Sequence, residues 1–256
     1  GSFIMAGSYT AYSVQEYLIS NTGVALITSL IIGFLVGGLI GVLLEVTLIQ
    51  HMYHRPLDTL LVTFGVGLIL QQLARDIFGA PAVRVLTPEW LSGGVEVLGT
   101  VVPKTRIFIL VLAIVCVVTL AAMMRYTAMG RRTRAVVQHR DLAEASGISS
   151  RKTDLTTFFI GSGLAGVAGV ALTLIGSTSS NTGTTYLIDA FLVVVIGGLG
   201  SIKGTVLAAF ALGILNSFIE YSTTASIAKV IIFALIIVVL QIRPQGLFPA
   251  QTRSLV

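Results

Sequence analysis

The fold class is decided by the stretch Val24-Ala-Leu-Ile-Thr-Ser-Leu-Ile-Ile-Gly-Phe-Leu-Val-Gly-Gly-Leu-Ile-Gly-Val-Leu-Leu-Glu-Val-Thr-Leu48. Its only charged residue is Glu45, and it exceeds the roughly 20 apolar residues that cross a hydrocarbon core of about 30 Å. Gly33, Gly37 and Gly41 recur every fourth residue, so they share one helix face and favour close contact with a second helix. The stretch therefore predicts a transmembrane helix that packs tightly against a neighbour.

The rest of the chain has the same character, since 55% of its 256 residues are hydrophobic and only 11% are charged. A soluble domain usually carries about 25% charged residues. The weakly apolar residues 3–18 predict a short N-terminal helix. Further apolar segments occupy residues 57–78, 107–124, 155–175, 186–196, 205–219 and 227–242. We therefore predict an all-α polytopic membrane protein with about seven transmembrane helices, in a single domain spanning residues 1–256.

The connection at residues 125–152 is the most basic part of the chain and sets the predicted orientation. Short cytoplasmic loops are enriched in Lys and Arg. If this loop is cytoplasmic and the segments cross alternately, most of the 16 basic residues lie inside, and so does the C-terminus. The alternation requires residues 186–196 to cross. Because this orientation explains the net charge of +5, the charge does not indicate a nucleic-acid partner.

A glycine cluster follows the segment 186–196, which is too short to cross a membrane as an ideal helix. The cluster consists of Gly197, Gly198, Gly200 and Gly204. So many glycines predict a broken or re-entrant element. Backbone groups that such breaks leave without a helical partner bind solutes in many transport proteins.

Polar side chains inside the apolar segments are candidates for a solute pathway. They are Glu45, Gln71, Gln72, Arg75, Asp76, Asp189, Asn216, Glu220 and Lys229. Charge within a bilayer is costly, so such groups line the bundle interior or a wet path, or they hydrogen-bond between helices. Both interpretations stay open for each residue. The candidate pathway residues, including neighbouring polar and glycine positions, are Thr63, Gln71, Gln72, Ser177, Asp189, Gly197, Gly198 and Asn216.

The sequence lacks the motifs of an enzyme, a nucleotide-binding protein or a metal site. H-E-x-x-H, G-x-S-x-G and C-x-x-C are absent, and so is the P-loop motif G-x-x-x-x-G-K-[ST]. His51 and His54 lack further ligands nearby for a metal ion. We therefore predict no catalytic residue, no metal and no cofactor, and expect any ATP-driven step to need another subunit.

The connection at residues 125–152 also contains a predicted cytoplasmic helix between Gly130 and Gly147, which suit helix ends. Small and apolar residues such as Ala143 are interspersed with charged ones, so this helix is amphipathic. Such a helix can insert into a groove on a partner protein. The alternative is a solvated basic loop that only fixes the topology.

Several stretches resemble one family of transport proteins. The run from Gly130 to Ile148, and Gly197-Gly-Leu-Gly-Ser-Ile-Lys-Gly204, resemble branched-chain amino acid type ABC permeases. Within this family, four stretches resemble the urea transporter permease B branch. The first is Arg55-Pro-Leu-Asp-Thr-Leu-Leu-Val-Thr-Phe-Gly-Val-Gly-Leu-Ile-Leu-Gln-Gln72, continuing to Ile77-Phe-Gly79. The others are Ile175-Gly-Ser-Thr178, Asp189-Ala-Phe-Leu-Val-Val-Val-Ile-Gly-Gly198, and Ala228-Lys-Val230 with Arg243-Pro-Gln-Gly-Leu-Phe248. The resemblance covers nearly the whole chain. The sequence Gly197-Gly-Leu-Gly-Ser201 departs from the urea branch and is closer to the amino acid branch.

The resemblance implies the permease subunit of an ATP-driven importer in the bacterial cytoplasmic (inner) membrane, working by alternating access. The implied partners are a second, related permease, two cytoplasmic ATPase subunits and an extracytoplasmic solute-binding protein. The permeases would form a heterodimer, with a homodimer as the alternative. The implied ATPase coupling residues are Arg134, Gln138, Asp141, Ala143, Glu144, Ala145 and Gly147. Family members carry another helix before the motif that reads Gly1-Ser-Phe-Ile-Met-Ala-Gly7 here, so we expect one family helix to be missing from this sequence.

The resemblance favours urea or a short amide as the solute. A small neutral polar molecule needs hydrogen-bond partners, which Gln71, Gln72 and Asn216 offer. A branched-chain or other amino acid is the alternative, since broken-helix ends near Gly197 would bind its carboxylate. A passive urea or amide channel is a hypothesis of another class, and it would not need a partner-docking loop. The lack of a catalytic set disfavours a membrane-embedded enzyme.

Overall fold

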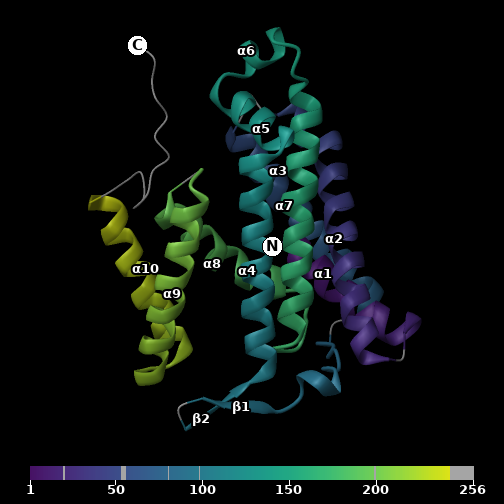
Figure 1. Cartoon of the computed structure of the whole chain (residues 1–256), viewed down its shortest axis with the longest axis vertical. Coiled ribbons are helices and arrows are strands. Elements are labelled where there is room, and N and C mark those ends of the chain that lie inside the picture. Colours follow the sequence, from purple (N-terminus) through teal and green to yellow (C-terminus); the bar gives the residue numbers. More distant parts are fainter. Residues whose placement is uncertain (20, 53–55, 80, 98, 199, 243–256) are drawn as a thin grey trace. The chain divides into compact units, whose positions relative to one another are not determined.

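The computed structural model describes residues 1–19, 21–52, 56–79, 81–97, 99–198 and 200–242. Most of these residues are helical, and the chain divides into two compact units, Gly1–Thr184 (unit 1) and Thr185–Val256 (unit 2). Figure 1 labels their elements. His54, Arg55 and the C-terminal Arg243 and Arg253 lie outside the described residues, and so does the predicted cytoplasmic C-terminus.

Unit 1 contains α1 (Ser2–Ser13) with a π-helical continuation (Val14–Leu18), α2 (Thr22–Thr47), α3 (Pro56–Phe78), β1 (Gly94–Val97), β2 (Thr100–Pro103), α4 (Lys104–Tyr126), α5 (Ala128–Gln138), α6 (Arg140–Ala145) and α7 (Ser150–Thr173). Single 3₁₀ turns lie at Ile49–His51 and Glu89–Leu91. Helix α8 (Thr182–Gly197) begins at the end of unit 1 and continues into unit 2, which also contains α9 (Ile202–Ser222) and α10 (Ala225–Ile242).

The predicted apolar segments all form helices. Among the described residues, five helices are long and apolar enough to cross a membrane, namely α2, α3 from Leu61 onward, α4, α7 and α9. Helices α8 and α10 are apolar but shorter. These seven helices match the seven predicted segments, and α1 with its continuation matches the short N-terminal helix. The prediction of a polytopic all-α membrane protein is confirmed.

Close contacts between glycines of α2 and α7 form the centre of unit 1. A Cβ atom placed on Gly37 would lie 2.6 Å from the carbonyl oxygen of Ser162 in α7, and one on Gly166 would collide with the carbonyl group of Gly33 in α2. Close backbone approach between small residues is a main source of packing energy between membrane helices. The predicted contact face of Gly33, Gly37 and Gly41 is therefore confirmed, and its partner is α7.

Helix α1 packs against both members of this pair. Ser8 is fully buried, and its hydroxyl shares its one proton between the carbonyl oxygens of Ile4 in its own helix (3.0 Å) and Gly169 in α7 (2.9 Å). Tyr9 stacks on Phe78 at the end of α3, with ring centroids 4.4 Å apart. The short N-terminal helix is thus a central part of unit 1 and connects α2, α3 and α7.

The polar connection at residues 79–106 contains a β-hairpin that the sequence analysis did not predict. Strands β1 and β2 are antiparallel, with Val95 opposite Val102, and Gly99 in the turn has φ +79°. β-Branched residues, of which β2 has three in succession, are the local signal for these strands. The hairpin precedes α4, whose other end leads into α5 and α6, so Figure 1 shows the hairpin and α5–α6 at opposite ends of α4.

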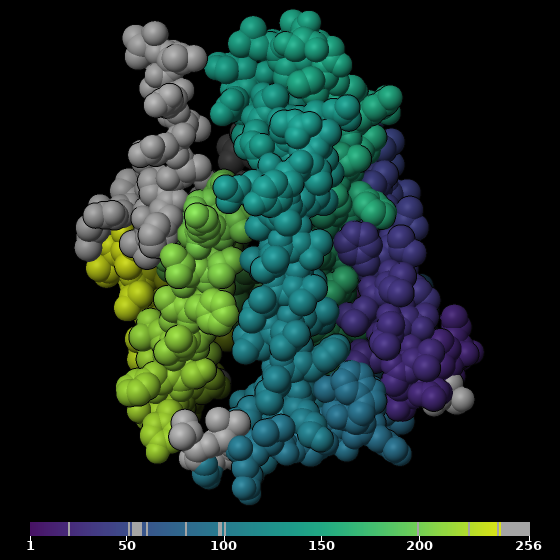
Figure 2. All heavy atoms as spheres, viewed as in Figure 1, coloured from purple at the N-terminus to yellow at the C-terminus, as the bar shows by residue number. Residues whose placement is uncertain are grey.

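Helix α4 itself has no buried residue among those described, and Figure 2 shows its side chains standing on the surface of unit 1. Phe108 and Ile109 pack against the core of unit 1, and the exposed apolar surface of the rest of the helix suits lipid or a partner helix.

In unit 2, the core of α8, α9 and α10 consists of Leu192, Ile196, Ala208, Ile232 and Ile236. The predicted break after residue 196 lies between α8 and α9. Gly198 and Gly200 adopt φ values of +90° and +85°, which only glycine accepts readily. The Ser201 hydroxyl then accepts a hydrogen bond from the amide of Gly204 (3.1 Å) and begins α9.

Candidate functional site

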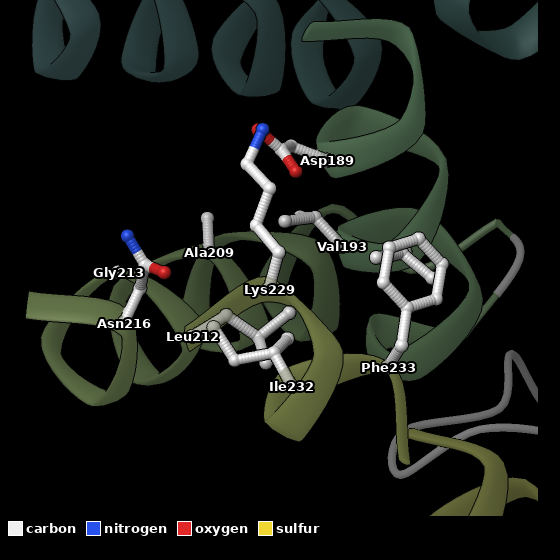
Figure 3. Close-up of a pocket in the computed structure, with 10 residues that line it drawn as sticks. Asp189, Val193, Ala209, Leu212, Gly213, Asn216, Lys229, Ile232 and Phe233 are labelled. Atoms are coloured by element: carbon white, nitrogen blue, oxygen red, sulfur yellow. The ribbon is translucent and has the colours of Figure 1, made fainter. Parts of the chain in front are cut away.

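Unit 2 contains a pocket of about 200 Å³ that is bounded by its three helices. Apolar walls come from residues such as Leu192, Leu212 and Phe233, while Ala209 and Gly213 on α9 leave space between the helices. Figure 3 shows three polar side chains directed at this space, those of Asp189, Asn216 and Lys229. An apolar cavity with a few convergent polar groups is the usual form of a small-molecule site.

The two charges in the pocket form an ion pair. The Nζ atom of Lys229 on α10 lies 3.9 Å from an Oδ atom of Asp189 on α8, and the two side chains are 47% and 48% exposed. Asn216 on α9 donates from Nδ2 to the carboxylate of Glu220, one turn later, at 3.5 Å. The pocket thus presents a carboxylate, an ammonium group and an amide beside apolar walls.

A second polar surface lies on α3 in unit 1. A groove of about 420 Å³ is lined by Leu68, Ile69, Gln71, Gln72 and Arg75. Two of these residues reach the segment before or at the start of α8: Gln71 Nε2 donates to the hydroxyl of Thr184 (2.6 Å), and Arg75 Nη2 donates to that of Ser180 (3.2 Å). Gln72 instead donates to Asp76 in its own helix (2.8 Å).

The remaining candidate pathway residues have different surroundings. The Thr63 hydroxyl donates to the carbonyl oxygen of Thr59 (2.8 Å), in the helix-bonding mode expected of an intramembrane threonine. Ser177 is exposed in the connection before α8. Gly197 and Gly198 are buried, and a Cβ on Gly197 would lie 2.5 Å from the Cα of Thr205. Gly197 therefore serves the close packing of α8 on α9, and Gly198 serves the turn between them.

The connection at residues 125–152 forms two helices, α5 and α6, where one was predicted. His139 interrupts them with an extended backbone (φ −150°, ψ 100°). Gly147 ends α6 with φ +81°, as predicted, and its amide donates to the carbonyl of Glu144 (2.9 Å). The prediction that Gly130 bounds the helix is wrong, because α5 begins at Ala128 after the Thr127 cap and Gly130 lies buried in its first turn against Met124.

Most of the candidate coupling residues lie on the surface of this pair of helices. The exposed ones are Arg134, Gln138, Asp141, Glu144, Ala145 and Gly147, whereas Ala143 is buried. The guanidinium of Arg134 donates to the carbonyl of Met124 in α4, and that of Arg140 contacts Asp154 in α7 at 2.7 Å. These contacts attach α5 and α6 to the ends of two predicted transmembrane helices.

Two features of these sites were not among the residues predicted to form them. Lys229 was among the polar residues inside the segments, but nothing in a single sequence indicated that it would face Asp189 across 40 residues. Val137 and Leu142 are 79% and 64% exposed on α5 and α6, although both are apolar. Their positions in a charged loop are the signal that could have revealed them, because apolar side chains exposed in water commonly mark a contact surface.

No group of three or more His, Cys, Asp or Glu side chains within the described ranges is arranged to hold a metal ion.

Known proteins resemble this chain over most of its length. The family model described as "Branched-chain amino acid transport system / permease component" matches residues 1–240. The high-affinity branched-chain amino acid transport system permease protein LivH of Escherichia coli is 27% identical over 260 residues, which cover 96% of this chain and 83% of that protein. BraD of Pseudomonas aeruginosa, a permease protein of the same description, is 27% identical with the same coverage. The ribose import permease protein RbsC of Escherichia coli is 31% identical over 47% of this chain and 40% of its own length. No solved structure matches the chain.

Proposed function

Because this chain belongs to the family of branched-chain amino acid transport permeases, we propose that it is the membrane-spanning permease subunit of an ATP-driven amino acid importer. The observation that carries the proposal is the family match over residues 1–240, which includes every described transmembrane segment up to α10. The chain is a multi-pass membrane protein, and we place it in a bacterial cytoplasmic membrane.

An amino acid is the solute that the observations favour. The relatives with high coverage are both described as branched-chain amino acid permease proteins. The pocket of unit 2 supports the same class, since apolar walls suit an aliphatic side chain and the Asp189–Lys229 pair supplies both signs of charge. The interpretation that the sequence analysis held as the alternative thus becomes the leading proposal.

Urea or a short amide is the second candidate. The polar surface of α3 favours it, because Gln71, Gln72 and Thr184 present neutral hydrogen-bonding groups beside the groove. A small neutral solute needs such partners in place of counter-charges. The stretches that resemble the urea branch, such as Ile175-Gly-Ser-Thr178, support the same candidate.

We propose that α5 and α6, within residues 125–152, dock on cytoplasmic ATPase subunits. The support is a surface that combines exposed charges, such as Asp141 and Glu144, with exposed apolar side chains at Val137 and Leu142. Salt bridges and hydrogen bonds to α4 and α7 would transmit movement of this surface to the transmembrane helices. The same orientation puts the β1–β2 hairpin on the extracytoplasmic side, where a solute-binding protein would deliver the solute.

The full assembly would contain this chain, a second related permease, two ATPase subunits and the solute-binding protein. ATP binding and hydrolysis in the ATPases would drive the permeases between outward-open and inward-open states. A heterodimer of permeases is our proposal, with a homodimer as the alternative that purification of the assembly would reveal.

Competition experiments test the solute. Cells that express the whole assembly would be given labelled leucine or labelled urea, with unlabelled leucine, urea and acetamide as competitors. We expect ATP-dependent leucine uptake that unlabelled leucine suppresses and urea does not. Urea uptake that leucine leaves unchanged would replace the amino acid proposal by the urea one. Uptake by this chain without ATPase subunits would favour a passive channel.

A further inference from the structure

The ion pair between α8 and α10 is located where a solute could reach it. Asp189 lies near the middle of α8, and Lys229 lies about one turn into α10. About half of each charged side chain is exposed, and the pair lines the pocket instead of being sealed in the core. Its separation of 3.9 Å is also long for a charge-assisted hydrogen bond.

A charge at membrane depth is costly, so the two groups neutralise each other when the pocket holds no solute. Ionisable residues within membrane segments commonly mark a solute path, which points to a use for both charges.

We propose that Asp189 and Lys229 together bind the charged ends of a zwitterionic amino acid. Asp189 takes the ammonium group, Lys229 takes the carboxylate, and the walls formed by residues such as Leu212 and Phe233 contact the aliphatic side chain. This inference rests on the proposed function as an amino acid permease, and it adds which residues of this chain recognise the solute.

Charge balance explains the selectivity that such a site would have. The pair has no net charge, and a zwitterion has none, so exchanging one ion pair for two leaves the pocket neutral. A cationic or anionic solute would leave one of the two residues without a counter-charge beside the apolar walls of the pocket. Urea carries no charge to replace either partner and would leave the pair closed. The long, flexible stem of Lys229 allows its ammonium to move away from Asp189 when the solute enters.

The experiment compares four forms of the chain in the full assembly with its ATPases and binding protein: the wild type, Asp189→Asn, Lys229→Gln and the double variant. The readout is the uptake of labelled leucine, normalised to the amount of assembled complex and to its basal ATPase rate. We expect each single variant to lower uptake at least about tenfold, equivalent to about 1.4 kcal/mol of solute binding.

The double variant decides between recognition and structure. If the pair serves only to neutralise two charges, removing both restores uptake to within about twofold of the wild type, and the proposal is overturned. If the charges bind the solute, uptake by the double variant stays at least about tenfold low although the complex assembles. Lys203→Gln, which removes a charge from the first turn of α9 outside the pocket, is the matched control and should transport leucine normally.

Failure of the two proposals can be told apart. A wild-type assembly that imports urea and no amino acid contradicts the proposed function. A wild-type assembly that imports leucine, together with single variants that import it equally well, contradicts only the role of Asp189 and Lys229.

Discussion

In the α2–α7 interface of unit 1, glycines bring two backbones into contact, whereas on α9 of unit 2 Gly213 and Ala209 leave a space between helices. Within the most apolar part of each helix, 33% of residues in α2 and 39% in α7 are buried, against 11% in α9. The same small residue therefore supports tight packing in one unit and solute-sized volume in the other. A rigid scaffold and a pocket with room to change fit the two needs of a transporter.

The largest effect is expected from a substitution that forces α2 and α7 apart. A Cβ on Gly166 would meet backbone atoms of Gly33 and Gly37, which cannot move without separating α2 from α7. We expect Gly166→Ala to destabilise the protein by about 3 kcal/mol, the upper end for overpacking. Thermal unfolding of the detergent-solubilised chain would measure it.

Gly161→Ala is the control on the same helix, because among the described residues nothing lies within 4 Å of the added Cβ. It should leave stability unchanged or raise it by up to about 1 kcal/mol through helix propensity. Equal destabilisation by both substitutions would contradict the role assigned to the α2–α7 contact.

The complementary substitution fills the pocket of unit 2. A Cβ on Gly213 meets no described atom within 4 Å, so Gly213→Val should fold normally with unchanged unfolding temperature. Its methyl groups would occupy volume that the solute needs, and leucine uptake should fall about tenfold, or about 1.4 kcal/mol. Normal uptake in a correctly assembled complex would show that the pocket is not on the solute's path. Gly161→Ala serves again as the control for uptake.

A smaller effect is expected at the proposed ATPase-docking surface. Leu142 is exposed on α6, so Leu142→Glu leaves the fold of unit 1 intact but places a charge in an apolar contact. We expect the ATPase activity stimulated by loaded binding protein to fall about fivefold, or about 1 kcal/mol. Ala143 is a poorer choice for this test, because it is buried and a larger side chain would disturb α6 itself. Arg151→Gln, exposed in the first turn of α7, is the control and should retain stimulation.

The smallest effect concerns the attachment of α6 to α7. Arg140 and Asp154 form an ion pair of 2.7 Å whose side chains are 41% and 17% exposed. Exposed pairs contribute little, so Asp154→Asn should destabilise the protein by less than about 1 kcal/mol. A shift in unfolding temperature no larger than that of Arg151→Gln would agree, whereas a shift approaching that of Gly166→Ala would mean that the pair is part of the scaffold.

The membrane helices could be predicted because their signal is compositional. Long apolar runs bounded by polar connections mark a helix without any knowledge of its neighbours. The glycine face at Gly33, Gly37 and Gly41 could also be predicted from its spacing, although not that α7 would be its partner. The break between α8 and α9 could be predicted because a high density of glycines indicates backbone freedom, and Gly198 and Gly200 do adopt positive φ values.

The hairpin and the candidate sites were harder to predict from the sequence, for physical reasons. Strands β1 and β2 are short, and their pairing depends on a turn inside a loop rich in other turn residues. Helices such as α9 are apolar on nearly all sides, so the sequence contains no amphipathic pattern from which to deduce which face is inward. Asp189 and Asn216 were selected because they are polar residues within apolar segments. That they line one pocket with Lys229 depends on the rotation of each helix, which only packing determines.

The hydrogen bond from Ser8 to the carbonyl of Gly169 has a consequence for biosynthesis. Its two residues are 161 positions apart, so at roughly 5–20 residues per second the ribosome needs about 8 to 32 s to make the second after the first. During that interval α1 lacks α7, the helix against which Ser8 and Gly7 pack. The centre of unit 1 can therefore be completed only after α7 has been synthesised.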